Sequence, residues 1–258
     1  FDGVDDRVEI ASPGADQKPT TAITVEAWVY STGSPEDFAG IVSNAQDNGS
    51  DEAGYYLTRR SNGNVEFLLS TGAGFTGPST PLPQNQWVHV AATYDGANSQ
   101  LYLNGILKST VAKTGSIDWV TAQANTVYTI GCYVDANESL EFSGKIDEVK
   151  IWNVARTQAQ IQADMCRKIA NSSGVSSLIA YFNFDETGGN AAYNQAGISI
   201  EYVLFPRGGL QSPAYQESVS VWCADDRRNA LTLAKRGEPV EPKICPNPIA
   251  ENLALAQK

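Results

Sequence analysis

The sequence predicts an all-β protein, built as an antiparallel two-sheet jelly-roll sandwich with one short helix. Apolar and polar residues alternate in many short runs, which is typical of strands that bury one face. Asn-Gly and Asp-Gly dipeptides separate several of these runs, and such dipeptides favour tight hairpin turns. Two half-apolar sheets can then fold by burying their apolar faces against each other.

The first strands show this alternation directly. In the run at 23–30, every second side chain is apolar, namely Ile23, Val25, Ala27 and Val29. Runs at 55–60 and 65–70 flank the sequence Ser-Asn-Gly-Asn at 61–64. Asn and Gly tolerate the positive φ of a tight hairpin, so these two runs predict a strand pair. Asp-Gly and Asn-Gly turns then join a predicted three-stranded meander at 87–94, 100–103 and 106–111,.

The remaining elements are three strands and one helix. The strands are predicted at 127–133, 144–152 and 178–184, with a polar, acidic loop at 134–142. Thr157 and Gln160 have the spacing of a helix capping box. An apolar stripe follows every four residues, which predicts a helix that ends at 171–174; its members are Ile161, Met165 and Ile169. We expect this helix to pack on an edge of the sandwich.

The chain divides into a predicted jelly-roll domain at 1–205 and an irregular, cysteine-containing extension at 206–258. The four cysteines are Cys132, Cys166, Cys223 and Cys245, and none forms a Cys-x-x-Cys pair. This spacing argues against a zinc or thioredoxin-like motif. An even number of cysteines in a turn-rich chain favours disulfides. Of the three possible pairings we predict Cys223–Cys245 with Cys132–Cys166, and buried free thiols are the alternative.

Composition limits the class of partner. The 258 residues are 42% hydrophobic and carry a net charge of −11, which disfavours nucleic acid and anionic lipid as partners. Calcium and neutral ligands suit such a surface better. No apolar run is long enough to cross a membrane, so we expect no membrane insertion. The chain begins with Phe and acidic residues, so we expect a mature or excised fragment, with possible glycan acceptors at Asn48, Asn137 and Asn171.

Catalytic motifs are not supported by their surroundings. The sequence GAGFTG at 72–77 fits the dinucleotide pattern, but prolines follow it at once where a helix would have to begin,. His89 is the only histidine and lies inside a predicted strand, which excludes a multi-histidine metal site. Asp147 and Glu148 are adjacent in a strand and would point to opposite faces, so they make no glycosidase pair. We therefore predict a protein without catalytic activity.

An ordered series of short motifs along residues 1–190 resembles the laminin-G-like and pentraxin-like group of concanavalin A-type jelly rolls. The series is FDGVDDRVEI at 1–10, TVEAWV at 24–29, WVHVAATYDG at 87–96, LYLNG at 101–105, TIG at 129–131 and GKIDEVKIWN at 144–153. The resemblance implies the predicted fold. It also implies a secreted or cell-surface module that binds carbohydrate, protein or matrix components, often with calcium.

Two calcium sites follow as expectations from the resemblance. In pentraxins the loop that corresponds to 134–142 holds calcium, and Asp135, Glu138 and Glu141 supply oxygens here,. The second half of that site maps to the hairpin at 61–64, where Asn62 or Asn64 is the candidate ligand. Related jelly rolls also bind a structural ion near the first strand, for which Asp2, Asp5 and Asp6 with Asp147 are candidates. Alternatively, Asp5 and Asp6 cap a turn and Asp147 accepts hydrogen bonds from backbone amides.

Exposed aromatic residues are the candidates for sugar contact. Trp119 lies in a weakly patterned stretch, so we expect it to be exposed, while Tyr55, Tyr56 and Tyr133 adjoin loops. The predicted ligand-binding set consists of Tyr55, Asn62, Trp119 and Tyr133. Trp28, Trp87 and Trp152 fall in strand patterns and are expected to pack in the core. The leading hypothesis is an extracellular adhesion module that recognises glycan or a matrix partner. The alternative is a structural repeat that assembles in tandem in a fibre or surface array.

Overall fold

A computed structural model places two compact units in the chain. They comprise Phe1–Phe184 with Ala192–Ile198, and Asp185–Ala191 with Ser199–Lys258. The predicted domain boundary after residue 205 lies outside the residues that the structure describes. Those residues are 1–4, 6–10, 18–33, 36–47, 52–72, 74–119, 128–135, 138–169, 175, 177–185, 213–225, 230, 233–234 and 238–247.

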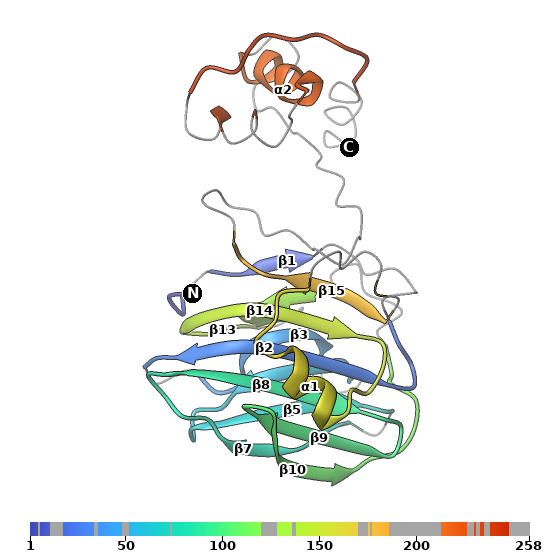
Figure 1. Ribbon diagram of the computed structural model, residues 1–258. Coiled ribbons are helices and arrows are strands. Elements are labelled where there is room, and N and C mark those ends of the chain that lie inside the picture. The colour runs from blue at the N-terminus through green and yellow to red at the C-terminus, as the bar shows by residue number, and fades with distance from the viewer. Residues whose placement is uncertain are drawn as a thin grey trace. The chain divides into compact units, whose positions relative to one another are not determined.

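The first unit is an antiparallel sandwich of two main sheets, which confirms the predicted fold class (Figure 1). One sheet has seven strands in the order β1-β11-β3-β4-β5-β6, and β7 also pairs with β5. Their bounds are β1 Val8–Ile10, β3 Ala39–Gln46, β4 Ala53–Arg59, β5 Asn64–Ser70, β6 Phe75–Thr76, β7 Ser79–Pro81 and β11 Tyr128–Ile130.

The second main sheet has six strands in the order β10-β9-β8-β2-β14-β15. Its strands are β2 Ile23–Ser31, β8 Trp87–Tyr94, β9 Asn98–Leu103, β10 Ile106–Ala112, β14 Gly144–Trp152 and β15 Leu178–Phe182. β12 (Cys132–Val134) and β13 (Ser139–Glu141) form a separate two-stranded sheet, in which β12 packs on β3. The predicted meander corresponds to β8, β9 and β10, which pair in sequence.

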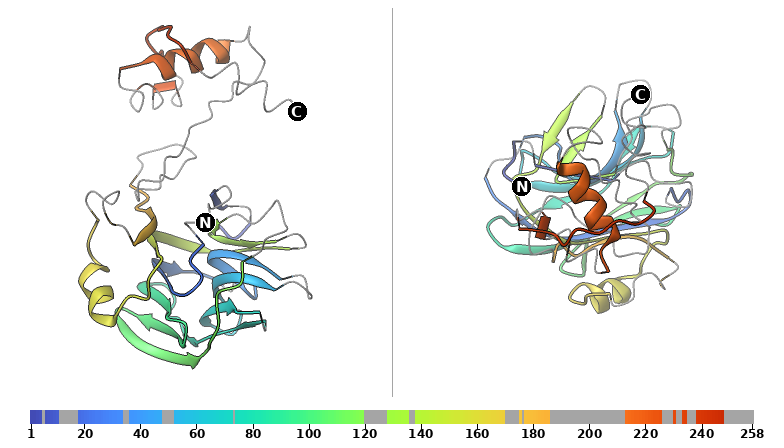
Figure 2. Two further views of the ribbon diagram at one scale, coloured as in Figure 1. Left: turned by 90° about the vertical axis from the view of Figure 1, so that its right-hand side faces the viewer. Right: turned by 90° about the horizontal axis from the view of Figure 1, so that it is seen from above.

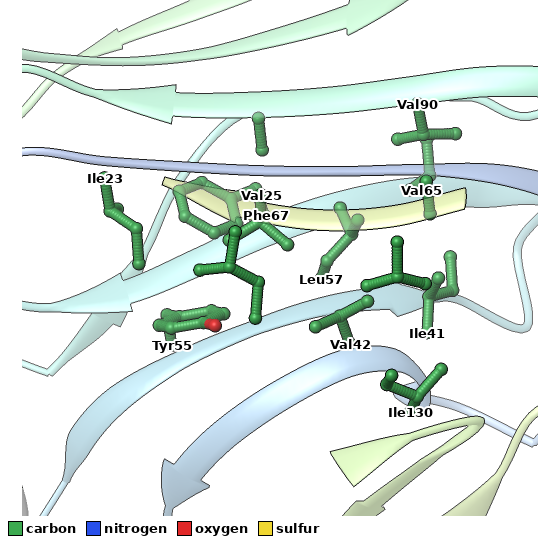
Figure 3. Packing of buried hydrophobic residues seen from close by; sticks show 14 of the residues in the cluster. Ile23, Val25, Ile41, Val42, Tyr55, Leu57, Val65, Phe67, Val90 and Ile130 are labelled. Atoms are coloured by element: carbon green, nitrogen blue, oxygen red, sulfur yellow. The ribbon is translucent and has the colours of Figure 1, made fainter. Parts of the chain in front are cut away.

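The core lies between the two sheets and follows the predicted alternation. The four apolar residues of β2 that we assigned to one face are all at most 1% exposed: Ile23, Val25, Ala27 and Val29. Figure 3 shows Ile23 and Val25 packed with Tyr55 and Leu57, which come from the other sheet. Burial of a large apolar side chain of this kind contributes about 1.5–3 kcal/mol.

The predicted tight turns are present. Gly63 has φ +97° in the turn between β4 and β5, and Asn104 and Gly105 have φ +49° and +71° between β9 and β10. The Asn62 side chain accepts a hydrogen bond from the Asn64 backbone N–H at 2.9 Å. The Asn104 side chain accepts one from the His89 backbone N–H, also at 2.9 Å. The second contact ties the turn to the neighbouring strand.

Helix α1 (Gln158–Asp164) begins at the predicted capping box of Thr157 and Gln160. It ends at Met165, earlier than predicted, because tertiary contacts bind its last carbonyls. The buried Lys150 ammonium donates to the Asp164 carbonyl at 3.4 Å, and the Trp28 indole donates to the Met165 carbonyl at 2.6 Å. The helix lies on the outer face of the six-stranded sheet and not on an edge as expected (Figures 1 and 2).

The predicted cysteine pairing is half right. Cys223 and Cys245 form a disulfide, whereas the predicted Cys132–Cys166 bond is wrong because both thiols are free. Cys132 is buried in β12, which packs on β3, and Cys166 follows α1 on the other sheet. Two sheets packed about 10 Å apart separate the two thiols, and a disulfide needs Cα atoms within about 7 Å.

The two free thiols should differ in reactivity. Cys166 is exposed, so we expect iodoacetamide to alkylate it in the native protein. Burial raises the pKa of the Cys132 thiol, and a protonated, buried thiol is a poor nucleophile. Without reductant, mass spectrometry should therefore find one alkylated cysteine in the native protein and two after unfolding. Equal labelling rates for both thiols would contradict the buried position of Cys132.

The second unit contains α2 (Pro213–Cys223), whose last residue is bonded to Cys245. Ser220 on this helix accepts a hydrogen bond from the Lys243 backbone N–H at 3.4 Å. The Lys243 ammonium contacts the Asp225 carboxylate at 2.7 Å. The disulfide and these polar contacts hold the segment 238–247 to the helix. In the part of the chain that is described, no helix has the length and hydropathy to cross a membrane.

Candidate ligand-binding surface

The outer face of the seven-stranded sheet carries a second apolar cluster, which we call the outer aromatic surface. It is formed by Phe38, Tyr56, Leu68, Phe75, Tyr133 and Leu140, packed around Ala45. Successive residues of a strand face opposite sides, so Tyr55 and Leu57 enter the core while Tyr56 points outward. Tyr56 and Tyr133 are almost fully buried, and the other members are half-buried.

The rings of this surface are packed around Tyr56. The Tyr133 ring stacks on it with centroids 5.1 Å apart, and the Phe75 and Phe38 rings meet it edge-on at 4.7 and 6.1 Å. Such aromatic pairs are worth about 0.5–1.5 kcal/mol beyond their buried area. The arrangement leaves the half-exposed rings of Phe38 and Phe75 in fixed positions, where a flat apolar ligand can pack.

Tyr133 reaches this surface because β12 lies directly on β3. A Cβ atom at Gly40 of β3 would come within 2.2 Å of the Tyr133 nitrogen and 2.5 Å of the Cys132 carbonyl oxygen. Only glycine permits that approach. The Ser43 and Thr129 hydroxyls then donate to the Cys132 carbonyl at 3.0 and 2.7 Å. The position of Tyr133 is therefore fixed by the backbone below it.

At one end of the surface, Phe38 is held by an ion-pair network. The guanidinium carbon of Arg60 lies 3.7 Å above the Phe38 ring centroid. Arg60 contacts both Asp37 oxygens at 2.9 Å and a Glu66 oxygen at 2.5 Å. The hydrogen bonds from Arg60 hold the pKa of Asp37 well below its usual range. Phe38 itself has φ +63°, a conformation that costs energy in a bulky residue and marks functional positions in many proteins.

The opposite end of the surface is acidic. The Asp135 carboxylate accepts hydrogen bonds from the Tyr133 hydroxyl at 2.9 Å and from the backbone N–H groups of Asp47 and Glu138 at 3.1 and 3.0 Å. Burial raises the pKa of Glu138, and the negative charges of Asp135 and Asp47 raise it further. These carboxylates give the corner a negative potential.

The predicted two-loop calcium site is only partly assembled. Asp135 and Glu138 lie together, but the hairpin with Asn62 is at the other end of β4, because Gln46 pairs with Ala53 and Ala39 with Arg59. The seven residues of β4 separate the two ends by about 20 Å. Within the described ranges, no three His, Cys, Asp or Glu residues are placed to hold a metal ion. Calcium binding at the Asp135 corner stays a prediction.

The other predicted calcium ligands are also apart. Asp2 pairs with Ser143 in an isolated bridge, and Asp147 lies four residues further along β14, about 13 Å away. The Asp6 carboxylate accepts a hydrogen bond from the Asp2 backbone N–H at 3.1 Å, and the Asp147 carboxylate accepts one from the Glu148 backbone N–H at 2.8 Å. These contacts match the alternative interpretation, in which Asp6 caps a turn and Asp147 accepts hydrogen bonds from backbone amides. Asp5 lies outside the described residues.

Two predicted sugar-contacting residues are in the core. Tyr55 is fully buried, and the expected exposure of Trp119 is wrong, because it is only 8% exposed. The Trp119 indole packs edge-on against Tyr55 with centroids 5.9 Å apart, and its N–H donates to the Pro19 carbonyl at 3.0 Å. The Pro19 carbonyl comes from a distant segment of the chain. The sequence pattern around Trp119 therefore gave no indication that this side chain is buried.

The outer aromatic surface contains two residues that sequence reasoning missed, Phe38 and Phe75, and a third, Tyr56, that it noted as adjoining a loop but did not select. The adjacent pair Tyr55-Tyr56 in a strand was an available signal, since one of the two rings must face outward. Of the three tryptophans expected in the core, Trp152 is buried and Trp28 is half-buried. The expectation for Trp87 is wrong, because it is 42% exposed.

Comparisons with known proteins agree with this fold. A protein of Bacteroides ovatus that is described as a proposed carbohydrate-binding protein has a similar structure, with a TM-score of 0.55. It is 22% identical, and the match covers 74% of this chain and 54% of that one. Human pappalysin-1 is 26% identical over 162 residues, which are 57% of this chain and 10% of that protein.

A different relative is the thiol:disulfide interchange protein DsbC of Salmonella typhimurium, 44% identical over 63 residues. These are 24% of this chain and 27% of that protein, so the chain spans about a quarter of the length of this relative. A family model described as the concanavalin A-like lectin/glucanases superfamily, Laminin G 3, matches residues 2–162. The chain therefore belongs to the Laminin G 3 family of the concanavalin A-like lectin/glucanase superfamily.

Proposed function

We propose that the first unit is a non-catalytic carbohydrate-binding module and that the outer aromatic surface holds the sugar chain. The observation that carries this proposal is the fixed group of four rings, Phe38, Tyr56, Phe75 and Tyr133, with polar groups at both ends. Rigid aromatic rings offer large apolar contact area at low entropic cost. The apolar faces of sugar rings can pack on them.

The polar ends of the surface supply hydrogen-bonding groups for sugar hydroxyls. Asp37, Glu66 and Asp135 present carboxylate oxygens, which accept hydrogen bonds, and Arg60 presents a planar donor group. A glycosidase needs one carboxyl group with a raised pKa as its acid, placed beside a second carboxylate. Arg60 instead lowers the pKa of Asp37, while the raised pKa of Glu138 belongs to the acidic corner at the other end. At the Phe38 end this supports a binding role over a catalytic one.

Phe75→Ala tests the surface. A glycan array would first identify a neutral oligosaccharide ligand, and calorimetry would then compare variants with it. Loss of one stacking ring should weaken binding about 5- to 10-fold, since such contacts contribute about 1 kcal/mol. Ile106→Ala is the matched control, because Ile106 is an exposed apolar residue on β10 in the other sheet. Unchanged affinity in Phe75→Ala, or equal loss in Ile106→Ala, would contradict the assignment.

The same array addresses calcium. We propose that any calcium dependence arises at the acidic corner of Asp135 and Glu138. Binding would then be lost in EDTA and restored by calcium, and Asp135→Asn would bind as weakly with calcium as the parent protein does in EDTA. Equal binding with and without EDTA would show that the sugar site works without the ion.

We further propose that the protein acts outside the cell, where its disulfide would be stable. The three candidate glycan acceptors, Asn48, Asn137 and Asn171, lie outside the described residues. Cys223–Cys245 closes a loop of 22 residues, which stabilises the second unit by about 3 kcal/mol in the chain-entropy model. Reduction should therefore speed proteolysis within 213–247 and leave the first unit intact. Equal resistance of 213–247 before and after reduction would contradict this role.

A structural repeat is the second candidate function. β10 is an edge strand of the six-stranded sheet, and it exposes Ile106 and Leu107, which are 53% and 39% accessible. Exposed edge strands with apolar side chains can pair with another chain. Sedimentation velocity of the full chain would detect such assembly, and Ile106→Lys should abolish it. A monomer at all concentrations would remove this candidate.

A further inference from the structure

The outer face of the six-stranded sheet carries an exposed row of three side chains, Trp87, Tyr30 and Lys145. These residues come from β8, β2 and β14, which are adjacent in the sheet. Tyr30 pairs with Trp87 on one side and with Lys145 on the other. Directly opposed residues point to the same face of a sheet. Their side chains therefore form one continuous strip across three strands.

The strip is open to solvent. Trp87 is 42% exposed, which is unusual for so large an apolar residue,. Its ring meets Tyr30 edge-on with centroids 5.7 Å apart. Helix α1 packs on other residues of this sheet, where Ile161 contacts Ala91 and Tyr102. The row thus offers one exposed indole beside a half-buried phenol.

Lys145 gives this row a positive charge. Its ammonium lies 5.6 Å from the Tyr30 ring centroid. Among the described residues, Lys145 takes part in no ion pair, in contrast to Arg60 and Lys150, which contact carboxylates. Asp147 is the next residue of β14 on the same face, but Lys145 forms no ion pair with it, so the ammonium can donate hydrogen bonds to a carboxylate of a ligand.

We propose that Trp87, Tyr30 and Lys145 form a second ligand-binding site, which takes a sugar that carries a carboxylate, such as a uronic acid. The sugar ring packs on Trp87 and its carboxylate contacts the Lys145 ammonium. The row spans two strand spacings, about 10 Å, which suits a short oligosaccharide and is far smaller than a stable protein interface. The acidic chain repels densely charged polymers, so a sugar with one carboxylate on each ring fits better than a more densely charged sulfated one.

This site is independent of the outer aromatic surface. The two lie on opposite sheets, share no residue and differ in charge, since the outer aromatic surface ends in the carboxylates of Asp135 and Glu138. Ligands for the two sites should therefore differ in charge as well. Either site can exist without the other.

Trigalacturonate and its methyl ester are the probes that test the proposal. The two trisaccharides have the same sugar rings, and the ester carries neutral methyl ester groups in place of the carboxylates. Tryptophan fluorescence and calorimetry of the full chain should show binding of trigalacturonate and at least 5-fold weaker binding of the ester. Protection of Trp87 from oxidation by N-bromosuccinimide, read by mass spectrometry, would place the ligand on the indole.

Variants separate the roles in this site. Lys145→Gln should weaken trigalacturonate binding 5- to 10-fold and leave binding of the ester unchanged. Trp87→Ala should weaken both at least 10-fold, with circular dichroism used to verify folding. Lys108→Gln is the matched control, because Lys108 is an exposed lysine on β10. It should leave both affinities unchanged.

Four results would overturn the proposal. The first is that the ester binds as tightly as the acid. The second is that neither binds while a neutral glycan still binds in a Phe75-dependent way, a result that would leave the proposed function intact. The third is that sulfated oligosaccharides bind through Lys145 and trigalacturonate does not. Finally, Trp87→Ala abolishes self-association of the chain, in which case the row is a protein contact.

Discussion

Replacing Glu26 by alanine is expected to lower the free energy of unfolding of the first unit by about 3–5 kcal/mol. Glu26 lies on β2 beneath α1 and is fully buried. Its Oε1 accepts hydrogen bonds from the Trp152 indole at 2.8 Å and from the Arg156 guanidinium at 3.3 Å. Alanine would leave a buried cation and a buried N–H group without this acceptor, and both would carry a desolvation cost.

Urea denaturation followed by circular dichroism measures this loss. Glu26→Gln is the matched control, because its amide oxygen can still accept from the Trp152 indole, and we expect it to lose clearly less stability. Burial raises the pKa of Glu26, while the charges of Lys150 and Arg156 oppose the shift. The expected loss in the free energy of unfolding of Glu26→Ala is about 3–5 kcal/mol. A loss of less than about 1 kcal/mol would show that the network contributes little.

The second large effect concerns acid stability and His89. Burial lowers the pKa of His89 to about 3, and the charges of Lys150 and Arg156 contribute in the same direction. Its ring is therefore neutral in the folded protein, and its 3.5 Å contact with Glu26 is not an ion pair at neutral pH. The unfolded chain binds a proton at His89 near pH 6.5, so its contribution to stability is complete above that pH and is lost as pH falls toward 3. At pH 4.5 the loss amounts to about 3 kcal/mol.

Because His89 is the only histidine, its proton NMR signal needs no assignment. The signal should not titrate between pH 8 and about 4. Because the pKa of Glu26 is raised, its contribution to stability changes with pH in the opposite direction to that of His89. Comparing the parent protein with His89→Gln therefore isolates the contribution of the histidine. The variant should lose about 3 kcal/mol less stability between pH 7 and pH 4.5. A histidine signal that titrates near pH 6.5 would disprove the buried, neutral state.

Much of the fold is encoded locally and could be predicted. The alternation in β2, the turns at Gly63 and Gly105, and the capping box of Thr157 all depend on neighbours within a few residues. The alternation assigns each side chain to a face, and the turn residues fix which strands pair. The ordered motifs then supplied the family, which the match over residues 2–162 confirms.

The remaining features depend on contacts between distant segments. The early end of α1 is set by Lys150 and Trp28, and the burial of Trp119 depends on the Pro19 carbonyl. The outer aromatic surface exists because β12 crosses β3 at Gly40. No local pattern contains such a crossing. The wrong pairing of Cys132 with Cys166 has the same origin, since a cysteine count carries no information about which sheet each thiol packs on.

The strict alternation along β4 has a consequence for how this module can change over time. Tyr55 and Leu57 stabilise the interior, while Tyr56 and its partner Leu68 on β5 belong to the outward face. Selection for a new specificity can therefore act on one set of positions while the other set keeps the protein folded. Randomising Leu68, Phe75 and Leu140 in a display library should yield many folded clones with diverse binding preferences.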